Sequence, residues 1–364
     1  MSSQLEHPTL LIPGPIEFDD DVLQSMSHYS ESHVGPGFVA TFGDTISMLR
    51  KLFQTTDPSA QPFVISGSGT LGWDIVAANL VEAGEDVLVL STGYFGDGFA
   101  DCFETYGAKL TKLTGTVGGR PQLPEIEKAL KSKKFKMVTV THVDTSTGVL
   151  SELENLSKLV KSVSPETLLV VDGVCSVACH RMPGRPVDIH VQRQGHRGFQ
   201  GAQDPARHVL CFHEELDADH AELRGQEAVL LRDALAAVDP RSAHRTHPDS
   251  VEAAIRALCD APRGLGWIKK AVADLGLKQV ASNPEDQAHG MTAIYLPEPV
   301  KATDLLPKLA KAGVVWAGGI HKEIAPKYVR FGHMGVSVTD PARKDIDKAI
   351  KALSNGLEEC GYKA

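Results

Sequence analysis

The chain has 364 residues with the composition of a globular protein: 42% are hydrophobic, 23% are charged, and the formal net charge is −9. This acidic balance argues against a nucleic-acid-binding protein, which would present a basic surface, and no stretch is long and apolar enough to predict a membrane span. The length is sufficient for one large domain and a smaller one.

The first part of the chain alternates apolar runs with helical patterns. An apolar run over residues 62–66 predicts a strand that meets the glycine-rich stretch 67–70, and a helical pattern follows to residue 81. Further buried strands are predicted over residues 86–90, 137–141 and 167–171. Such runs, separated by helices, predict βαβ units and a mostly parallel sheet. Polar residues gather at the strand ends, where ligands bind in open α/β sheets.

The C-terminal part of the chain predicts a smaller α+β domain. Its helices and strands are expected over residues 267–275, 291–296, 303–312, 314–315 and 342–357. We therefore expect a large domain over residues 1–266 and a small C-terminal domain over residues 267–364.

Between these parts the hydrophobic periodicity fails, from about residue 190 to about residue 249. Seven of the 15 histidines lie between His190 and His247, and no lysine occurs between Lys161 and Lys269. Long structureless segments inside compact domains are uncommon. We therefore regard the segment over about 185–266 as anomalous and expect it, with this sequence, to be disordered or misfolded.

The cysteines and the chain ends carry no sorting or disulfide pattern. The six cysteines are scattered, unlike the dense disulfide framework of short secreted domains. Residues 1–8 lack a basic amphipathic pattern, and Gly361–Ala364 is not the Ser-Lys-Leu peroxisomal signal. No metal site is predicted. We expect a cytoplasmic protein, with a peroxisomal or mitochondrial location left open.

The stretch Gly67–Thr70 is a candidate phosphate site. It lies between a predicted strand and a predicted helix, and backbone N–H groups at a helix N-terminus bind a phosphate dianion well when hydroxyls lie beside them. A tight turn without a ligand explains the same residues.

Several residues with chemical potential follow predicted strands. Asp172 ends a buried strand, where a carboxylate needs a cationic or N–H partner; a protonated pyridine nitrogen would serve, and so would the N–H groups of the next turn. Phe95 is suited to stacking on a cofactor ring or to packing in the core. Ser146 is suited to binding a phosphate or a ring hydroxyl. His142 is suited to acid–base chemistry or to a structural role.

Arg330 lies among apolar residues in a predicted half-buried strand. A guanidinium group binds a carboxylate through two parallel hydrogen bonds, as an amino-acid or keto-acid substrate requires. An ion pair with an internal acidic residue is the alternative.

Taken together, these residues resemble the class V, fold-type I aminotransferases, which use pyridoxal 5'-phosphate (PLP), and closely the alanine–glyoxylate and serine–pyruvate branch. The matching stretches are residues 11–15, 32–34, 66–74, 92–97, 142–149, 171–176, 317–322 and 330–335. The resemblance covers residues 8–180 and 267–355. It implies a homodimer with a large parallel-sheet domain and a smaller C-terminal domain, acting on small amino-acid and keto-acid substrates.

The resemblance also implies residue roles and a reaction. Ser68, Gly69 and Thr70 would bind the phosphate of PLP. The other implied roles are ring stacking for Phe95, a cofactor contact for Ser146, the ring-nitrogen contact for Asp172, a ring-face contact for Val174 and substrate-carboxylate binding for Arg330. The implied reaction moves the amino group of alanine to glyoxylate and gives pyruvate and glycine. A serine–pyruvate or serine–glyoxylate transaminase is the alternative within enzymes.

The resemblance fails at the catalytic lysine. The family places its Schiff-base lysine roughly two dozen residues after the strand-end aspartate, in the pattern Thr-x-Ser-x-Lys, and without it there is neither a covalent anchor for PLP nor a base for the proton shift. The family's later Tyr-Phe-Ala-Thr-Pro stretch is also missing. A catalytically inactive protein of the PLP fold is therefore a third interpretation.

A shifted reading frame explains both absences. When the first base of each codon is dropped, Gln194 followed by Gly195 can encode only Lys or Arg. The shifted codons of residues 190–197 permit Thr-Ser-Ser-Ala-Lys-Ala-Ile-Gly, and those of residues 230–234 permit Tyr-Phe-Ala-Thr-Pro. Our hypothesis is that residues over about 185–266 are read out of frame, and that the Schiff-base lysine belongs at position 194.

Overall fold

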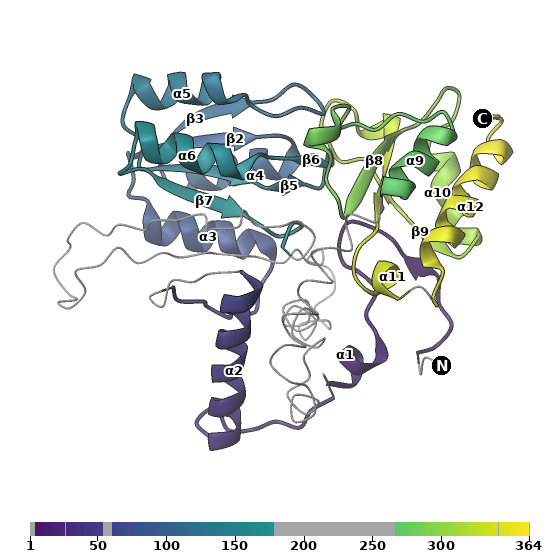
Figure 1. Ribbon diagram of the computed structural model, residues 1–364, viewed down its shortest axis with the longest axis horizontal. Coiled ribbons are helices and arrows are strands. Elements are labelled where there is room, and N and C mark those ends of the chain that lie inside the picture. The colour runs from purple at the N-terminus through teal and green to yellow at the C-terminus, as the bar shows by residue number, and fades with distance from the viewer. Residues whose placement is uncertain (1–3, 26, 54–59, 178–265, 341, 364) are drawn as a thin grey trace.

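A computed structural model describes residues 4–25, 27–53, 60–177, 266–340 and 342–363 (Figure 1). The anomalous segment lies outside the described residues, together with the expected lysine position Gln194. Among the helices of the described residues, none has both the length and the apolar character needed to cross a membrane.

The larger part is built on a parallel sheet with the strand order β3-β2-β4-β7. The strands are β2 (Asp86–Ser91), β3 (Lys109–Thr114), β4 (Met137–Thr141) and β7 (Leu168–Asp172). Both central strands, β2 and β4, and the outer strand β7 are almost continuously apolar and buried, as is usual for parallel strands that are covered on both faces. The predicted parallel sheet is confirmed.

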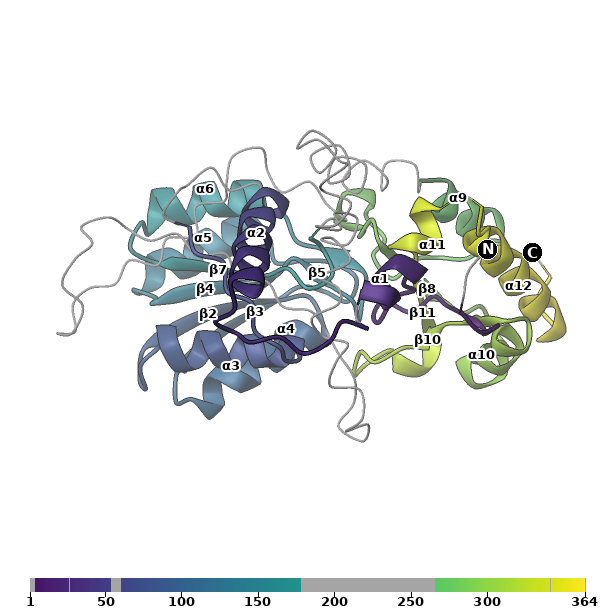
Figure 2. The ribbon, with the colours of Figure 1, turned by 90° about the horizontal axis from the view of Figure 1, so that it is seen from below.

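Helices cover the two faces of this sheet (Figure 2). Successive side chains of a strand point to opposite faces. Val87 and Val89 therefore pack under α3 and α4, whereas Leu88 and Leu90 pack under α5 and α6. The helices are α3 (Gly69–Leu80), α4 (Tyr94–Thr105), α5 (Leu123–Ser132) and α6 (Leu153–Val163).

The smaller part contains an antiparallel sheet with the order β10-β11-β8 and helices packed beside it. Its elements are α9 (Gly266–Asp274), β8 (Met291–Tyr295), α10 (Ala302–Lys311), β9 (Val314–Val315), β10 (Ala317–Gly318), β11 (Tyr328–Gly332), α11 (Val336–Thr339) and α12 (Asp345–Glu359), with short 3-10 turns at Pro284–Asp286 and Ala325–Lys327. These elements match the predicted α+β region. The boundary between residues 266 and 267 stays a prediction.

The N-terminal segment runs along both parts. Its strand β1 (Thr9–Leu10) pairs in parallel with β9 of the smaller part, and α1 (Asp20–Ser25) and α2 (Pro36–Leu52) follow. Helix α2 projects away from the layered sheet in Figure 1. The strand predicted over residues 62–66 is wrong: these residues form no strand, and Phe63 and Ile65 are exposed.

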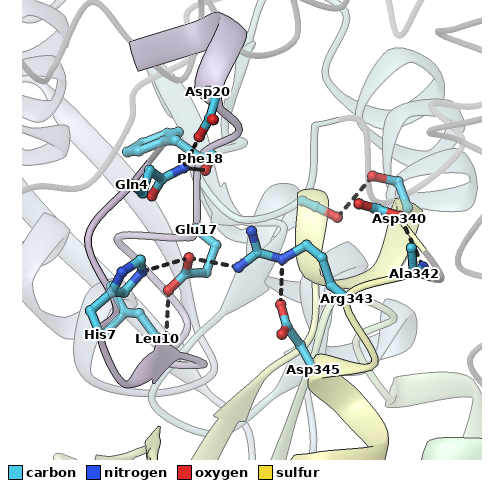
Figure 3. A network of polar contacts seen from close by, with 12 residues as sticks. Gln4, His7, Leu10, Glu17, Phe18, Asp20, Asp340, Ala342, Arg343 and Asp345 are labelled. Atoms are coloured by element: carbon cyan, nitrogen blue, oxygen red, sulfur yellow. Dashed lines mark hydrogen bonds and ion pairs between the residues drawn. The ribbon is translucent and has the colours of Figure 1, made fainter. Parts of the chain in front are cut away.

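A buried ion-pair network fixes this N-terminal segment to the smaller part (Figure 3). Glu17, 6% exposed, accepts a hydrogen bond from the backbone N–H of Leu10 at 2.7 Å and pairs with Arg343 Nη2 at 2.9 Å. Arg343 Nε pairs in turn with Asp345 at 2.7 Å. The network satisfies charges that would be costly to bury unpaired.

Candidate active site

Asp172 is the last residue of β7 and is 4% exposed. Its Oδ1 accepts a hydrogen bond from the backbone N–H of Val174 at 3.1 Å, and its Oδ2 accepts one from the indole N–H of Trp73 at 3.2 Å. Burial raises the pKa of the Asp172 carboxyl to about 6, the neighbouring Asp144 adds to the rise, and the two N–H donors oppose it. Its hydrogen-bond partners among the described residues are uncharged, so the carboxylate suits a cationic ligand.

The predicted phosphate loop lies at the start of α3. Ser68 is the N-cap residue with extended backbone, and its side chain makes no capping bond within the described residues. The hydroxyls of Ser68 and Thr70 lie 2.7 Å apart in a hydrogen bond on the exposed side of the helix start. The N-terminus of α3 and the paired hydroxyls together suit a phosphate dianion. Helix α3 also contains Trp73, which donates to Asp172.

Phe95 lies in the first turn of α4, half-buried beside Trp73. Their ring centroids are 6.4 Å apart with planes at 65°, and Trp73 also stacks on Phe99 at 5.3 Å. Phe95 therefore belongs in part to the core, as one interpretation held. Stacking on a cofactor ring stays a prediction for Phe95, as does the ring-face contact for Val174, which follows Asp172 in the next turn.

Ser146 is fully buried and its hydroxyl is held by two neighbours. It donates to Asp144 Oδ1 at 2.6 Å and accepts the backbone N–H of Tyr94 at 2.9 Å. Asp144, also fully buried, accepts the backbone N–H of Gly96 at 3.2 Å. Burial raises the pKa of Asp144, and hydrogen bonds from Ser146, Gly96 and Phe95 oppose the rise. This arrangement makes Ser146 an organiser of the start of α4; its contact with a cofactor stays a prediction.

The surroundings of His142 favour a structural role over acid–base chemistry. It is 5% exposed, and its backbone N–H donates to the backbone carbonyl of Asp172 at 2.9 Å. Burial lowers the pKa of His142 to about 3, with the neighbouring His289 acting in the same direction. A neutral imidazole with so low a pKa is a poor proton acceptor at neutral pH.

Arg330 reaches from β11 towards the large part. Its Nε donates to the backbone carbonyl of Gly318 at 2.7 Å, and its Nη1 lies 3.5 Å from the carbonyl of Thr145. Two residues earlier, the Tyr328 hydroxyl donates to the carbonyl of Ser146. Strand β11 therefore places a guanidinium group beside the loop that holds Ser146, and substrate binding by Arg330 stays a prediction.

The described residues fit PLP in their chemistry. The hydroxyl pair at the start of α3 suits the phosphate, the buried Asp172 with uncharged N–H donors suits a protonated ring nitrogen, and Arg330 suits a substrate carboxylate. Sequence reasoning missed Trp73, Asp144 and Tyr328 as parts of this site. Only the carboxylate of Asp144, in a polar loop directly after a predicted strand, could have been singled out from the sequence.

Comparisons with known proteins agree with this fold. The family described as Aminotransferase class-V matches residues 14–191. Alanine–glyoxylate aminotransferase 1 of Saccharomyces cerevisiae is 36% identical over 94% of this chain and 97% of its own length. Serine–glyoxylate aminotransferase of Methylorubrum extorquens is 26% identical over 90% of this chain and 86% of its own length.

The solved structure of ureidoglycine–glyoxylate aminotransferase from Bacillus subtilis matches with a TM-score of 0.75 and 20% identity, over 99% of this chain and 95% of that chain. This likeness shows the fold. The family match ends at residue 191, within the segment where the hydrophobic pattern fails.

Proposed function

This chain belongs to the class V aminotransferase family, and from that premise we propose that it transfers the amino group of alanine to glyoxylate, giving pyruvate and glycine. The observation that carries the proposal is the buried Asp172 at the end of β7, whose partners among the described residues are the N–H groups of Trp73 and Val174. Alanine and glyoxylate are taken from the name of the yeast relative, alanine–glyoxylate aminotransferase 1.

When bound, PLP supplies an electron sink for charge that develops on the substrate carbon. In this proposal the start of α3 binds the phosphate through Ser68 and Thr70. Asp172 holds a proton at the ring nitrogen, because an anion beside the ring favours the protonated form. Arg330 orients the substrate by its carboxylate. Phe95 and Val174 cover the faces of the ring and exclude water.

The missing lysine is part of the same proposal. We hold that the residues over about 185–266 are read out of frame and that position 194 carries Lys or Arg in place of Gln194. The end of the family match at residue 191 supports this, and so does the recovery of two family motifs by one shift. If Gln194 is the native residue, we propose an inactive protein of the same fold, because the sequence between Lys161 and Lys269, where the family has its Schiff-base lysine, contains no lysine.

A serine-dependent reaction is the second candidate. The 26% identity to serine–glyoxylate aminotransferase over most of both chains favours it. Arg330 would bind the carboxylate of either amino acid, so the described site does not separate alanine from serine.

The proposal includes a homodimer and a cytoplasmic location. Helix α2 exposes Phe38 at 38%, Val39 at 57% and Phe42 at 42%, and apolar side chains gathered on one helix favour contact with a partner. A second copy of this chain is the partner that we propose. Sedimentation equilibrium on the full chain tests the dimer: a monomer at micromolar concentration would contradict it.

The reaction is tested with purified protein and added PLP. Alanine and glyoxylate should give pyruvate and glycine in equal amounts, and each product should depend on both substrates. Serine in place of alanine measures the second candidate. If protein with Lys at position 194 forms neither pyruvate nor glycine from any pair, the proposed function is wrong.

A further inference from the structure

Trp73 lies in the second turn of α3 and is 7% exposed. Its indole N–H donates to Asp172 Oδ2 at 3.2 Å, across 99 residues of sequence. The helix that begins with Ser68 and Thr70 is thereby tied to the strand that ends with Asp172. One side chain joins the group suited to a phosphate to the group suited to a ring nitrogen.

The indole ring is fixed by its packing on α4. It stacks on Phe99 with centroids 5.3 Å apart and planes at 14°, and Phe95 meets it at 65°. A Cβ at Gly98 would lie 3.0 Å from Trp73 Cζ3, so glycine there leaves room for the indole. The N–H donor is therefore held in one direction, since ring rotation would break these contacts.

The donor acts on a carboxylate that burial disfavours in its charged form. Besides Trp73, Asp172 is faced by the N–H group of Val174 and by the carboxylate of Asp144. An N–H bond favours the ionised form of a carboxylate, whereas the neighbouring Asp144 disfavours it. Trp73 is uncharged, so it supports the negative charge of Asp172 without neutralising it.

We propose that Trp73 is a positioning residue for the cofactor, which orients the Asp172 carboxylate towards the ring nitrogen and sets its distance from the phosphate-binding start of α3. This inference rests on the proposed function, because it requires PLP in this site. It extends that function to a residue outside the predicted contacts with the cofactor.

Trp316 provides a matched control. It is also buried, at 5% exposed, and stacks on an aromatic ring, Phe331, at 4.3 Å. Its indole N–H has no hydrogen-bond acceptor among the described residues. Trp316→Phe therefore makes the same change of side chain at a buried position, but it removes no hydrogen bond to Asp172.

The probe is pyridoxamine 5'-phosphate, which carries the ring and phosphate but binds without a lysine. Its affinity for the full-length protein, for Trp73→Phe and for Trp316→Phe is measured by calorimetry from pH 5 to pH 8. Trp73→Phe should bind about tenfold more weakly, the scale of a hydrogen bond to a charged group. As the pH is lowered, the affinity of Trp73→Phe for the probe should begin to fall at a higher pH than that of the parent protein. The reason is that loss of the indole N–H donor raises the pKa of Asp172. Trp316→Phe should follow the parent protein.

Replacing Trp73 by 3-benzothienylalanine keeps the bicyclic ring and removes only the N–H donor, so it should repeat the shift if the phenylalanine variant folds poorly. Equal affinities and equal pH profiles for the parent, Trp73→Phe and the benzothienyl variant would overturn the inference alone. A loss of equal size at every pH would also overturn it, since packing would explain it. Failure of the parent protein to bind the probe would overturn the proposed function and this inference together.

Discussion

The hydroxyl of Tyr328 donates a 2.5 Å hydrogen bond to the backbone carbonyl of Ser146 and accepts the backbone N–H groups of Ile320 and His321, each at 3.0 Å. Tyr328 is fully buried in β11, two residues before Arg330. One side chain therefore holds the smaller part against the loop that organises the start of α4.

Tyr328→Phe should lower the free energy of unfolding by about 2 kcal/mol, because it leaves the buried carbonyl of Ser146 and the part-buried N–H groups of Ile320 and His321 without their partner. Urea denaturation measures the change. Tyr295→Phe is the control, since the Tyr295 hydroxyl has no hydrogen bond among those shown for the described residues and the ring is only half-buried. Equal losses in the two variants would show that the three bonds contribute nothing specific.

Gly93 should not tolerate a side chain. A Cβ there would lie 2.2 Å from Ser146 Oγ and 2.9 Å from Asp144 Cγ. Both side chains are buried, and the Ser146 hydroxyl donates a hydrogen bond to the Asp144 carboxylate. We expect Gly93→Ala to lower the free energy of unfolding by about 2 kcal/mol or more. Gly37→Ala in α2 meets nothing within 4 Å, so its stability should not fall. A Gly93→Ala protein as stable as the parent would contradict the described geometry.

Asp172 should make the cofactor-free protein less stable as pH rises from about 4 to about 6. Its folded-state pKa of about 6 lies well above the ordinary pKa of an aspartic acid side chain, so the native state binds more protons than the unfolded state in this window and loses stability as they leave. The difference in the free energy of unfolding between Asp172→Asn and the parent protein should change by about 2–3 kcal/mol between pH 4 and pH 6. Thermal unfolding without PLP at pH 4, 5, 6 and 7 measures it, and a difference that is constant with pH would refute the assignment.

Arg330→Lys should raise the KM for alanine and for glyoxylate by about tenfold or more, because an ammonium group cannot reproduce the paired hydrogen bonds of a guanidinium group. Steady-state kinetics on protein that carries Lys at position 194 measures this. Arg343→Lys lies in the network with Glu17 and Asp345, so it should lower stability and leave KM unchanged. An unchanged KM in Arg330→Lys would exclude Arg330 as the carboxylate site.

Local pattern was sufficient for much of the fold. The strand predicted over 86–90 is observed as Asp86–Ser91, and the helix predicted over 267–275 as Gly266–Asp274. Strand ends also identified Asp172 as a buried carboxylate. The strand predicted over residues 62–66 was wrong because the apolar composition of the run was taken as a sign of burial, whereas Phe63 is 64% exposed.

The parts of the site that escaped prediction depend on contacts between distant segments. Trp73 fits the apolar face of α3 equally well whether or not its N–H finds an acceptor, and only the packing of α3 on the sheet brings Asp172 within reach. The bond from Tyr328 to Ser146 spans 182 residues in the same way. No local spacing carries such information.

This chain is a PLP-dependent transaminase, and we expect its Schiff-base lysine at position 194. Protein from the native source is reduced with borohydride, which fixes PLP to the lysine that binds it, and the peptides over residues 180–267 are sequenced by mass spectrometry. We expect a pyridoxyl group on a lysine at position 194, followed by peptides of the shifted frame. Unmodified peptides that contain Gln194 and continue from Val191 to Ser250 as in the present sequence would contradict the claim and leave an inactive protein of this fold.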